Sequence, residues 1–260
     1  MFIVVGKRSR SVKTDLKGKL VWITGGAVGL GRSMALGFAA EGANITFSYN
    51  RSEKEATETA ARVKASGVEC LAQKVDVRDV DQIRKAAAEI EAAFGRIDVL
   101  INNAGVFLRT PLEEMTEQQF DETIDVNLRA TLFASQQAAS RMKRQGGGSI
   151  LNISSVGGLV PWSRYPAYCA SKAAALMATR CMALALAPDI RVNCIAPGVL
   201  TVPEHMRGDD GSRVEKLKRS IPLREFGRYD DVVEAALFLT KSGRYITGET
   251  LVVDGGRQLK

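Results

Sequence analysis

Two side chains in the second half of the chain are spaced so that they could move a proton. Tyr168 and Lys172 stand four residues apart in Tyr165–Ala187, a stretch whose pattern predicts a helix, so they share one helical face. A free tyrosine has a pKa near ~10, too high for a base at neutral pH, and a nearby ammonium group lowers it. Tyr168 could therefore act as a general acid or base whose pKa is set by Lys172.

A glycine-rich segment near the N-terminus could bind the phosphates of a nucleotide. It reads Thr24-Gly25-Gly26-Ala27-Val28-Gly29-Leu30-Gly31 and separates a strand pattern from a helical pattern. Glycines let the backbone turn tightly and approach a pyrophosphate, and the free N–H groups at a helix start attract phosphate. The position of the segment, between the first strand and the first helix, is the one that dinucleotide binding requires.

Short apolar strand patterns alternate with longer helical patterns along the whole chain. The predicted strands are Lys19–Ile23, Asn44–Tyr49, Glu69–Lys74, Val99–Ile101, Ser149–Ile153, Arg191–Ile195 and Thr250–Val253. The predicted helices are Gly29–Glu41, Ser52–Ser66, Asp79–Phe94, Thr116–Arg144, Tyr165–Ala187 and Asp230–Leu239. This alternation predicts an α/β fold, a Rossmann-type doubly wound parallel sheet of about seven strands with helices on both faces.

We expect one domain over residues 15–260, preceded by a basic, flexible arm over residues 1–14. The longest connection runs from Pro197 to about Leu223, and loops of this length in α/β domains are often functional. We therefore expect a substrate lid over about residues 199–223.

Composition excludes several classes of protein. The chain has 260 residues, 45% of them hydrophobic, and no apolar run approaches the ~20 residues of a membrane helix, so we expect a cytoplasmic protein without a membrane partner. The net charge is +7, but no basic stripe interleaved with aromatic residues suggests nucleic acid. The four cysteines form no C-x-x-C pair and His205 is the single histidine, so no metal site is predicted.

Five motifs, in the same order along the chain, resemble those of the short-chain dehydrogenase/reductase family. They are the T-G-x-x-x-G-x-G loop, Asn102-Asn103-Ala104-Gly105, Tyr168-Cys169-Ala170-Ser171-Lys172, Pro197-Gly198 and Asp254-Gly255-Gly256. The resemblance covers residues 15–260. It implies an oxidoreductase acting on CH–OH groups, which moves a hydride between a nicotinamide cofactor and a carbonyl or secondary alcohol.

The resemblance also implies a role for each matching residue. Tyr168 would exchange a proton with the substrate oxygen, Ser155 would donate a hydrogen bond to that oxygen, and Ser154 is a structural neighbour. Lys172 would also bind the nicotinamide ribose, and Asn127 would support a water-linked proton path to it. The implied cofactor contacts are Gly25, Val28, Gly29, Leu30, Gly31, Asp76, Val77, Asn103, Ala104, Gly105, Tyr168, Lys172, Pro197, Gly198 and Leu200. Thr201 stands one position before the family's usual threonine and is not assigned.

The residues after the second strand favour NADP(H). NAD enzymes place a carboxylate where this chain has Tyr49, and Asn50, Arg51 and Ser52 instead offer donors and a positive charge to a 2′-phosphate. NAD(H) is not excluded, because many NADP-preferring relatives carry an arginine where this chain has Val28.

The expected substrate is a small carbonyl or alcohol compound bound by Phe107 to Thr110, Gly157 to Tyr165 and Pro203 to Ser220. Within these segments the aromatic side chains suit an apolar or ring-bearing substrate, and Arg109 and Arg164 suit an anionic tail.

Several more specific readings stay open. The motif set most resembles 3-oxoacyl-acyl-carrier-protein reductases, in which case Arg141, Lys143 and Arg144 could dock an acidic carrier protein. The short Ala187–Arg191 link and the Gly256-Arg257 ending are similar to pteridine reductases, and a sugar or polyol dehydrogenase is a third reading. Outside this chemistry, a non-catalytic NADP-binding regulator and a serine hydrolase compete, although this sequence lacks the G-x-S-x-G elbow that a hydrolase needs.

Relatives usually form homotetramers through the helices at Thr116–Arg144 and Tyr165–Ala187, so we expect a homotetramer here.

Overall fold

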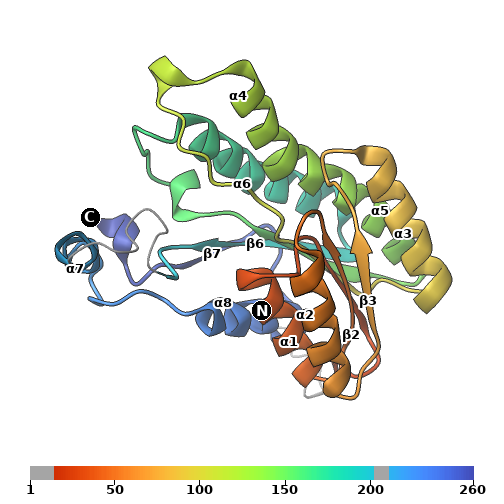
Figure 1. Ribbon diagram of the computed structural model, residues 1–260. Helices are drawn as coiled ribbons and strands as arrows, with labels where there is room; N and C mark the ends of the chain where they lie inside the picture. Colours follow the sequence, from red (N-terminus) through yellow and green to blue (C-terminus); the bar gives the residue numbers. More distant parts are fainter. Residues whose placement is uncertain (1–14, 202–210) are drawn as a thin grey trace, which may run out of the picture.

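A seven-stranded parallel sheet carries the fold of the protein, as seen in a computed structural model that describes residues 15–201 and 211–260 (Figure 1). The strands are β1 (Leu20–Ile23), β2 (Asn44–Tyr49), β3 (Cys70–Lys74), β4 (Val99–Asn102), β5 (Gly148–Ile153), β6 (Ile190–Pro197) and β7 (Thr250–Val253). Their order is β3-β2-β1-β4-β5-β6-β7, and every neighbouring pair is parallel. The strand order therefore reverses between β1 and β4, where α/β sheets of this type bind ligands.

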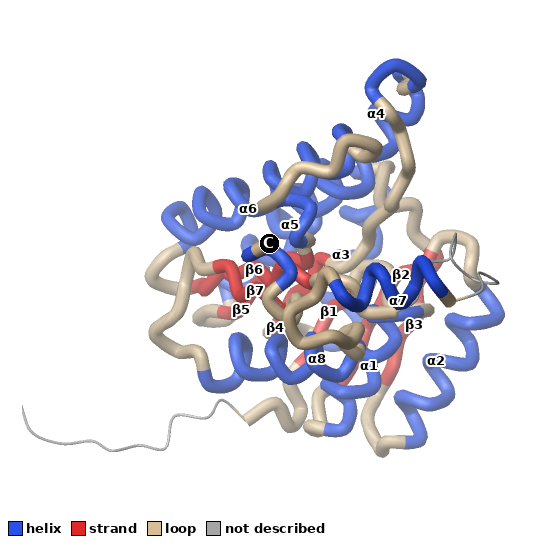
Figure 2. Tube along the Cα trace, turned by 90° about the vertical axis from the view of Figure 1, so that its left-hand side faces the viewer, coloured by secondary structure: helices blue, strands red, loops and turns tan. Residues whose placement is uncertain are grey.

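Helices cover both faces of the sheet, as Figures 1 and 2 show. One face carries α1 (Gly29–Ala40), α2 (Glu53–Ala65) and α8 (Tyr229–Leu237), and the other carries α3 (Val80–Phe94), α5 (Ala130–Arg144) and α6 (Pro166–Leu186). Helix α4 (Glu117–Ile124) extends outward from α5, and α7 (Ser212–Arg219) lies at the side of the molecule near the C-terminus.

The strands are apolar because both sheet faces are covered. All four residues of β1 are buried, and the side chains on its two faces pack into two separate cores. Met34 and Phe38 of α1 fill one core, and Ile83 of α3 and Met142 of α5 fill the other.

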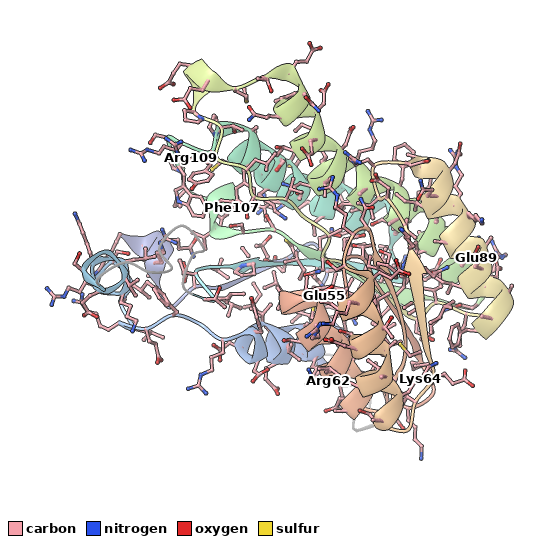
Figure 3. All side chains as sticks on the ribbon, viewed as in Figure 1. Glu55, Arg62, Lys64, Glu89, Phe107 and Arg109 are labelled. Atoms are coloured by element: carbon pink, nitrogen blue, oxygen red, sulfur yellow. The ribbon has the colours of Figure 1, made fainter. Side chains whose placement is uncertain are left out.

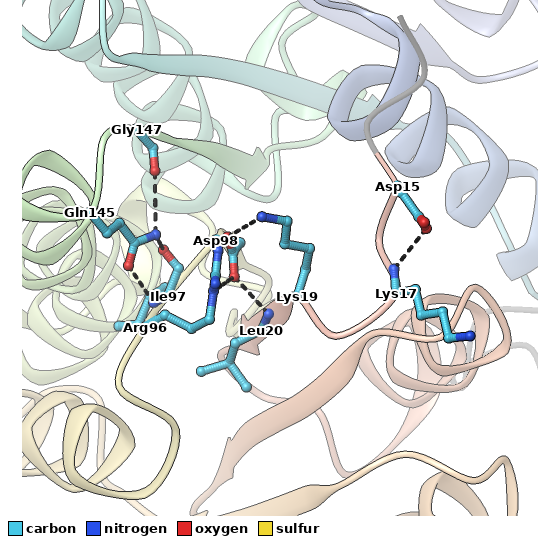
Figure 4. Close-up of polar contacts among 9 residues, drawn as sticks. All are labelled: Asp15, Lys17, Lys19, Leu20, Arg96, Ile97, Asp98, Gln145 and Gly147. Atoms are coloured by element: carbon cyan, nitrogen blue, oxygen red, sulfur yellow. Dashed lines mark hydrogen bonds and ion pairs between the residues drawn. The ribbon is translucent and has the colours of Figure 1, made fainter.

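A polar network fixes the amino-terminal ends of the central strands (Figure 4). Asp98 accepts the Leu20 backbone N–H at 2.9 Å and pairs with Arg96 at 2.6 Å and Lys19 at 3.4 Å. Burial acts to raise the pKa of Asp98, but the hydrogen bonds from Arg96 and Leu20 and the charge of Lys19 outweigh it, so the pKa is lowered. This network lies at the edge of the sheet opposite the carboxyl ends of the strands and is structural.

The predicted fold class is confirmed: all seven strands are found, two with the predicted ends and five with ends that differ by one or two residues. Two helix predictions need correction. The predicted helix Thr116–Arg144 is divided into α4 and α5 by the π-helical segment η2 (Asp125–Arg129), and α8 begins at Tyr229 and continues into a second π-helical segment, Phe238–Ser242.

The connection after Pro197 was predicted as a lid without regular structure, but it contains α7. Residues 202–210 of that lid, with Pro203 and His205, and the predicted arm over residues 1–14 lie outside the described residues. By length and composition alone α6 could cross a membrane, and no other helix of the described ranges could. Here α6 packs against β6 and against the 3-10 turn η3 (Val156–Gly158), as part of the α/β domain.

Candidate active site

Two cavities follow the carboxyl ends of the strands. The smaller, of about 470 Å³, lies beyond β1 to β4, and the larger, of about 980 Å³, lies beyond β5 to β7. The smaller is lined by Gly25, Val28, Leu30, Gly31, Ser48, Tyr49, Asn50, Arg51, Ser52, Val75, Asp76, Val77, Arg78, Asn103, Ala104, Gly105, Val106, Glu122 and Val126. Because the strand order reverses in the middle of the sheet, the smaller cavity lies beside a separate, larger one.

The glycine loop forms one wall of the smaller cavity. Gly25 and Gly29 have φ of 69° and 54°, a backbone region that disfavours other residues, and a Cβ on Gly31 would lie 2.1 Å from the Gly25 carbonyl oxygen. The Asn103 side chain closes the turn by donating to the carbonyl oxygens of Gly25 at 2.9 Å and Thr24 at 3.1 Å. No side chain caps the start of α1, whose first N–H groups are left to bind an anion. These residues fit a dinucleotide.

Most of the sequence-predicted cofactor residues line this cavity, and six do not. Gly29 forms the turn without lining the cavity, Tyr168, Gly198 and Leu200 line the larger cavity, and Lys172 and Pro197 are buried without lining either. The structure adds Ser48 and Arg78, which sequence reasoning missed.

Asp76 and Arg78 form a tight pair at the far end of the smaller cavity. The guanidinium Nε of Arg78 donates to both carboxylate oxygens of Asp76, at 2.9 and 3.1 Å. These hydrogen bonds, together with one from Asn50, lower the pKa of Asp76. The Asn50 amide is thus directed at Asp76, whereas Arg51 is exposed and has no ion pair within the part of the chain that the structure describes. Of the predicted 2′-phosphate donors, Arg51 and Ser52 stay free for a ligand.

Ser155 follows β5 and lines the larger cavity. Its Oγ accepts the backbone N–H of Gly157 at 3.0 Å as the first turn of η3 begins, which leaves the hydroxyl hydrogen able to donate. The neighbouring Ser154 instead donates its hydroxyl to the Lys172 carbonyl oxygen at 2.8 Å and is buried. The two serines therefore have different surroundings, Ser155 at the cavity and Ser154 buried against the backbone of α6.

Tyr168 and Lys172 lie on α6, one turn apart, and both are strongly affected by burial. Burial raises the pKa of Tyr168, although its hydrogen bond with Ser155 lowers it in part. Burial lowers the pKa of Lys172 to about 8. The Lys172 Nζ lies 5.9 Å from the centre of the Tyr168 ring and donates to the Ile153 carbonyl oxygen at 2.9 Å. The sequence predicted a lowered tyrosine pKa, but in this structure desolvation of Tyr168 outweighs the hydrogen bond with Ser155 and raises the pKa.

Asn127 lies in η2 and reaches the same place from the other side. Its amide donates to the Ser171 hydroxyl at 3.0 Å and to the Val106 carbonyl oxygen at 3.1 Å, and its Oδ1 accepts the Val106 N–H. A Cβ on Gly105 would lie 3.4 Å from both Asn127 Oδ1 and Lys172 Nζ. Asn127 and Lys172 therefore both lie close to Gly105, in the wall of the smaller cavity.

Four aromatic rings form the wall of the larger cavity. Phe107 stacks on Tyr165 with ring centres 4.5 Å apart, Trp162 stacks on Tyr168 at 6.1 Å, and Phe107 meets Tyr168 edge-on at 4.7 Å. Figure 3 shows Phe107 and Arg109 close together, on the side of the molecule where α7 lies. The remaining lining residues are Arg109, Ser155, Arg164, Gly198, Val199, Leu200, Thr201, Leu217 and Arg257.

The predicted substrate segments therefore meet at one cavity, and Thr201, which the sequence left unassigned, also lines it. Arg257 was not predicted as a site residue, although the sequence analysis noted the Gly256-Arg257 ending. It reaches the cavity because the chain turns back after β7, where Asp254 accepts N–H groups from Gly256 and Gln258 at 2.7 Å each. Residues 15–201 and 211–260 contain no group of three or more histidine, cysteine, aspartate or glutamate side chains that could hold a metal ion.

Comparison with known proteins gives consistent matches over nearly the whole chain. A family model described as enoyl-(acyl carrier protein) reductase matches residues 25–258. A 3-oxoacyl-(acyl-carrier-protein) reductase of Staphylococcus aureus is 37% identical over 240 residues, which are 92% of this chain and 97% of that protein. A solved short-chain dehydrogenase/reductase from Serratia marcescens superposes with a TM-score of 0.88 at 33% identity, covering 94% of this chain and 100% of that one. A blue fluorescent protein from a metagenomic library, solved in complex with NADPH, gives a TM-score of 0.86 at 35% identity, with 94% and 99% covered.

Proposed function

The chain belongs to the short-chain dehydrogenase/reductase family and is an oxidoreductase acting on CH–OH groups, and from this premise we propose that it is an NADP(H)-dependent ketoreductase. One observation carries the proposal. Tyr168 and Ser155 line the larger cavity, while Lys172, one helical turn further on, reaches Gly105 in the wall of the smaller one. A hydride donor in the smaller cavity and a proton donor facing the larger one are what reduction of a carbonyl requires.

The cofactor and the side chains of the protein contribute different parts of the proposed reaction. When bound, the reduced nicotinamide supplies the hydride that adds to the carbonyl carbon. The Tyr168 hydroxyl gives its proton to the carbonyl oxygen, and the Ser155 hydroxyl donates a hydrogen bond to the same oxygen as negative charge develops on it. Since burial raises the pKa of Tyr168, the phenol is protonated at neutral pH, which suits the direction of reduction.

Lys172 and Asn127 would help to return a proton to Tyr168 after it has protonated the substrate oxygen. With its pKa lowered to about 8, Lys172 exchanges a proton near neutral pH more readily than a solvent-exposed lysine, whose ordinary value is 10.5. Asn127 is held by Val106 and Ser171 with its Oδ1 beside Gly105, where it supports a water-linked path toward Lys172.

The preference for NADP(H) rests mainly on Arg51. Its guanidinium borders the smaller cavity, is exposed and matches the geometry of a phosphate group. Titration of wild type and Arg51→Ala with NADPH and with NADH, followed by fluorescence, tests this preference. We expect Arg51→Ala to weaken NADPH by about 10- to 100-fold, as for loss of one hydrogen bond to a charged group, and NADH much less.

Arg62→Ala is the matched control, because Arg62 is exposed in the last turn of α2 and does not line the cavity (Figure 3). Equal weakening of both nucleotides by Arg51→Ala would refute the 2′-phosphate contact. A wild type that binds neither nucleotide would refute the proposed function itself.

The alternatives separate in the same assay. A non-catalytic NADP-binding regulator would bind NADPH tightly yet oxidise it with no member of a carbonyl panel, whereas a serine hydrolase would cleave esters without any nucleotide. Within the family chemistry, the panel would separate 3-oxoacyl, pteridine and sugar or polyol substrates.

The interpretation as an acyl-carrier-protein reductase loses one of its arguments, the docking patch of Arg141, Lys143 and Arg144. Arg141 and Arg144 both bind Glu91, at 2.9 and 2.5 Å. Their helix ends beside Gln145, which donates to the Ile97 carbonyl oxygen at the amino-terminal edge of the sheet. Because both cavities lie at the opposite edge, this placement does not favour Arg141, Lys143 and Arg144 as the docking site of a carrier protein.

A homotetramer is proposed for the assembly. On α6, Met177 and Leu184 are 56% and 84% exposed and stand seven residues apart, so they lie on one face of the helix that another chain could cover. Light scattering should give the mass of four chains, and a single-chain mass at working concentration would refute it.

A further inference from the structure

Among the described residues, the side chains that line the larger cavity carry positive charge and no negative charge. Three arginines line it, Arg109, Arg164 and Arg257, and no acidic side chain does so among the residues described. The three come from separate segments, and the Thr110 N–H bonds the Arg164 carbonyl oxygen at 3.0 Å, which brings two of those segments together. Three like charges facing one hollow repel one another, so an anion placed between them is favoured.

Arg257 is the arginine whose position is most restricted. Its guanidinium carbon lies 5.4 Å from the centre of the Trp162 ring, and burial lowers its pKa in spite of the nearby Asp254 carboxylate. Asp254 itself is occupied by the Gly256 and Gln258 N–H groups, at 2.7 Å each. Within the described part of the chain, the Arg257 guanidinium has no hydrogen bond or ion pair. A half-buried guanidinium without such a partner has five donors available to a ligand.

The wall next to Arg257 is aromatic, with two stacked ring pairs that stand nearly perpendicular to each other. The Trp162 ring is a neighbour of both Arg257, at 5.4 Å, and Tyr168, the proposed proton donor, at 6.1 Å, so the cation and the reacting group lie near the same indole. Phe107 and Tyr165 extend this wall with a second stacked pair. A planar substrate lying along the wall would have its carbonyl at Tyr168 and its far end near Arg257.

We infer that the substrate is a carbonyl compound with a planar or ring-bearing apolar part and an anionic group, a carboxylate or a phosphate, which Arg257 binds. Arg109 and Arg164, which are exposed at the same cavity, attract the anion and are secondary to Arg257. The inference rests on the proposed ketoreductase function and specifies its substrate class.

The test compares three aryl ketones that differ only in one group. The probes are 4-acetylbenzoate, 4-acetylphenyl phosphate and the neutral methyl 4-acetylbenzoate, each assayed by NADPH oxidation in wild type, Arg257→Gln and the control Arg244→Gln. Arg244 is exposed and does not line the cavity. We expect at least one anionic probe to exceed the ester about 10-fold or more in kcat/KM, as for one hydrogen bond to a charged group.

Arg257→Gln should reduce this anion-to-ester ratio toward one, while Arg244→Gln should keep it. The preferred probe then identifies the anionic group as carboxylate or phosphate. The ratio in wild type should also fall as salt is raised from about 0.05 to 0.5 M, because salt screens charge attraction.

Equal kcat/KM for ester and anions, or a ratio that Arg257→Gln leaves unchanged, would overturn the inference and leave the ketoreductase function standing. Failure of the function looks different, namely no NADPH oxidation with any carbonyl compound of a broad panel. Binding of the three probes to the NADPH complex, followed by tryptophan fluorescence, then decides the inference independently of turnover. An anion that binds no more tightly than the ester would overturn it there as well.

Discussion

The Nζ of Lys172 donates a 2.9 Å hydrogen bond to the carbonyl oxygen of Ile153, the last residue of β5. This bond ties α6 to the strand end that Ser155 follows, and so keeps Ser155 and Tyr168 on the same cavity wall. It also places the ammonium group in a buried position, and burial lowers the pKa of Lys172 to about 8. Burial of the charged Lys172 side chain therefore lowers the unfolding free energy of the protein.

The cost predicts a pH-dependent difference between wild type and Lys172→Met. In the unfolded chain Lys172 loses its proton near its ordinary pKa of 10.5, but in the folded protein near about 8. Below about pH 8 both states are protonated and the full cost of burying the charge is present, and between about pH 8 and 10.5 the cost is relieved. We expect the unfolding free energy of wild type to rise relative to Lys172→Met across this window, by on the order of 3 kcal/mol.

Urea denaturation of both proteins at several pH values measures this difference. Cys194 lies near Lys172, and burial raises the pKa of its thiol to about 11, but it is present in both proteins and its own titration cancels to first order. A stability difference that stays constant from pH 7.5 to pH 10 would contradict the prediction.

Tyr168→Phe should remove turnover and leave nucleotide binding nearly intact. The substitution deletes only the hydroxyl that gives the proton, and Tyr168 lines the larger cavity, not the smaller one. We expect kcat to fall by about 10²- to 10⁴-fold, the usual contribution of a general acid. Steady-state rates and an NADPH titration on the same preparation measure both effects. Retained activity would exclude Tyr168 from the proposed role.

Gly31→Ala should abolish tight nucleotide binding. The added Cβ would lie 2.1 Å from the Gly25 carbonyl oxygen and 2.6 Å from the Asn103 amide nitrogen, so the glycine loop could not keep its shape. We expect NADPH affinity to fall by on the order of 100-fold, or about 2.7 kcal/mol. Fluorescence titration gives the dissociation constant, and circular dichroism checks that the variant is folded. Unchanged affinity would show that the loop does not hold the phosphates.

Gly158→Ala should lower turnover and leave NADPH binding nearly unchanged, the opposite of what we expect for Gly31→Ala. A Cβ there would lie 2.8 Å from the Lys172 carbonyl carbon and 2.9 Å from the Ala173 nitrogen, both backbone atoms of α6. Relief of this clash moves the turn that begins at Ser155 away from Tyr168. Because a displacement of about 1 Å at reacting groups can cost ~100-fold in rate, we expect kcat to fall at least about 10-fold. NADPH affinity should change by less than about twofold, since Gly158 does not line the smaller cavity; a selective loss of NADPH affinity would contradict this account.

The strands and the residues that follow them could be predicted from the sequence, and the reason is physical. Strands covered on both faces are short continuous apolar runs, as β1 is, and in a parallel sheet the residues after each run meet at one edge. Gly25, Asn103, Ser155 and Gly198 could be assigned to the site on this basis and by family resemblance.

Features that depend on contacts between distant segments could not be predicted. The π-helical segment around Asn127 has the same apolar periodicity as the helices on either side, so one long helix was predicted. Arg257 lines the cavity only because the chain turns back after β7, and Asn50 is turned toward Asp76, which follows the neighbouring strand β3. The pKa of Tyr168 depends on how deeply its hydroxyl is buried, and spacing to Lys172 carries no information about that.

The division of the site into two cavities also has a consequence for biosynthesis. Every lining residue of the smaller cavity lies between Gly25 and Val126, whereas the larger cavity needs residues as far along as Arg257. During translation the ribosome therefore releases the whole lining of the nucleotide half before the first residue of α6. The groups proposed to handle the substrate oxygen and its anionic end follow later in the chain, so a nascent chain exposes the lining of the smaller cavity before it can act on a substrate.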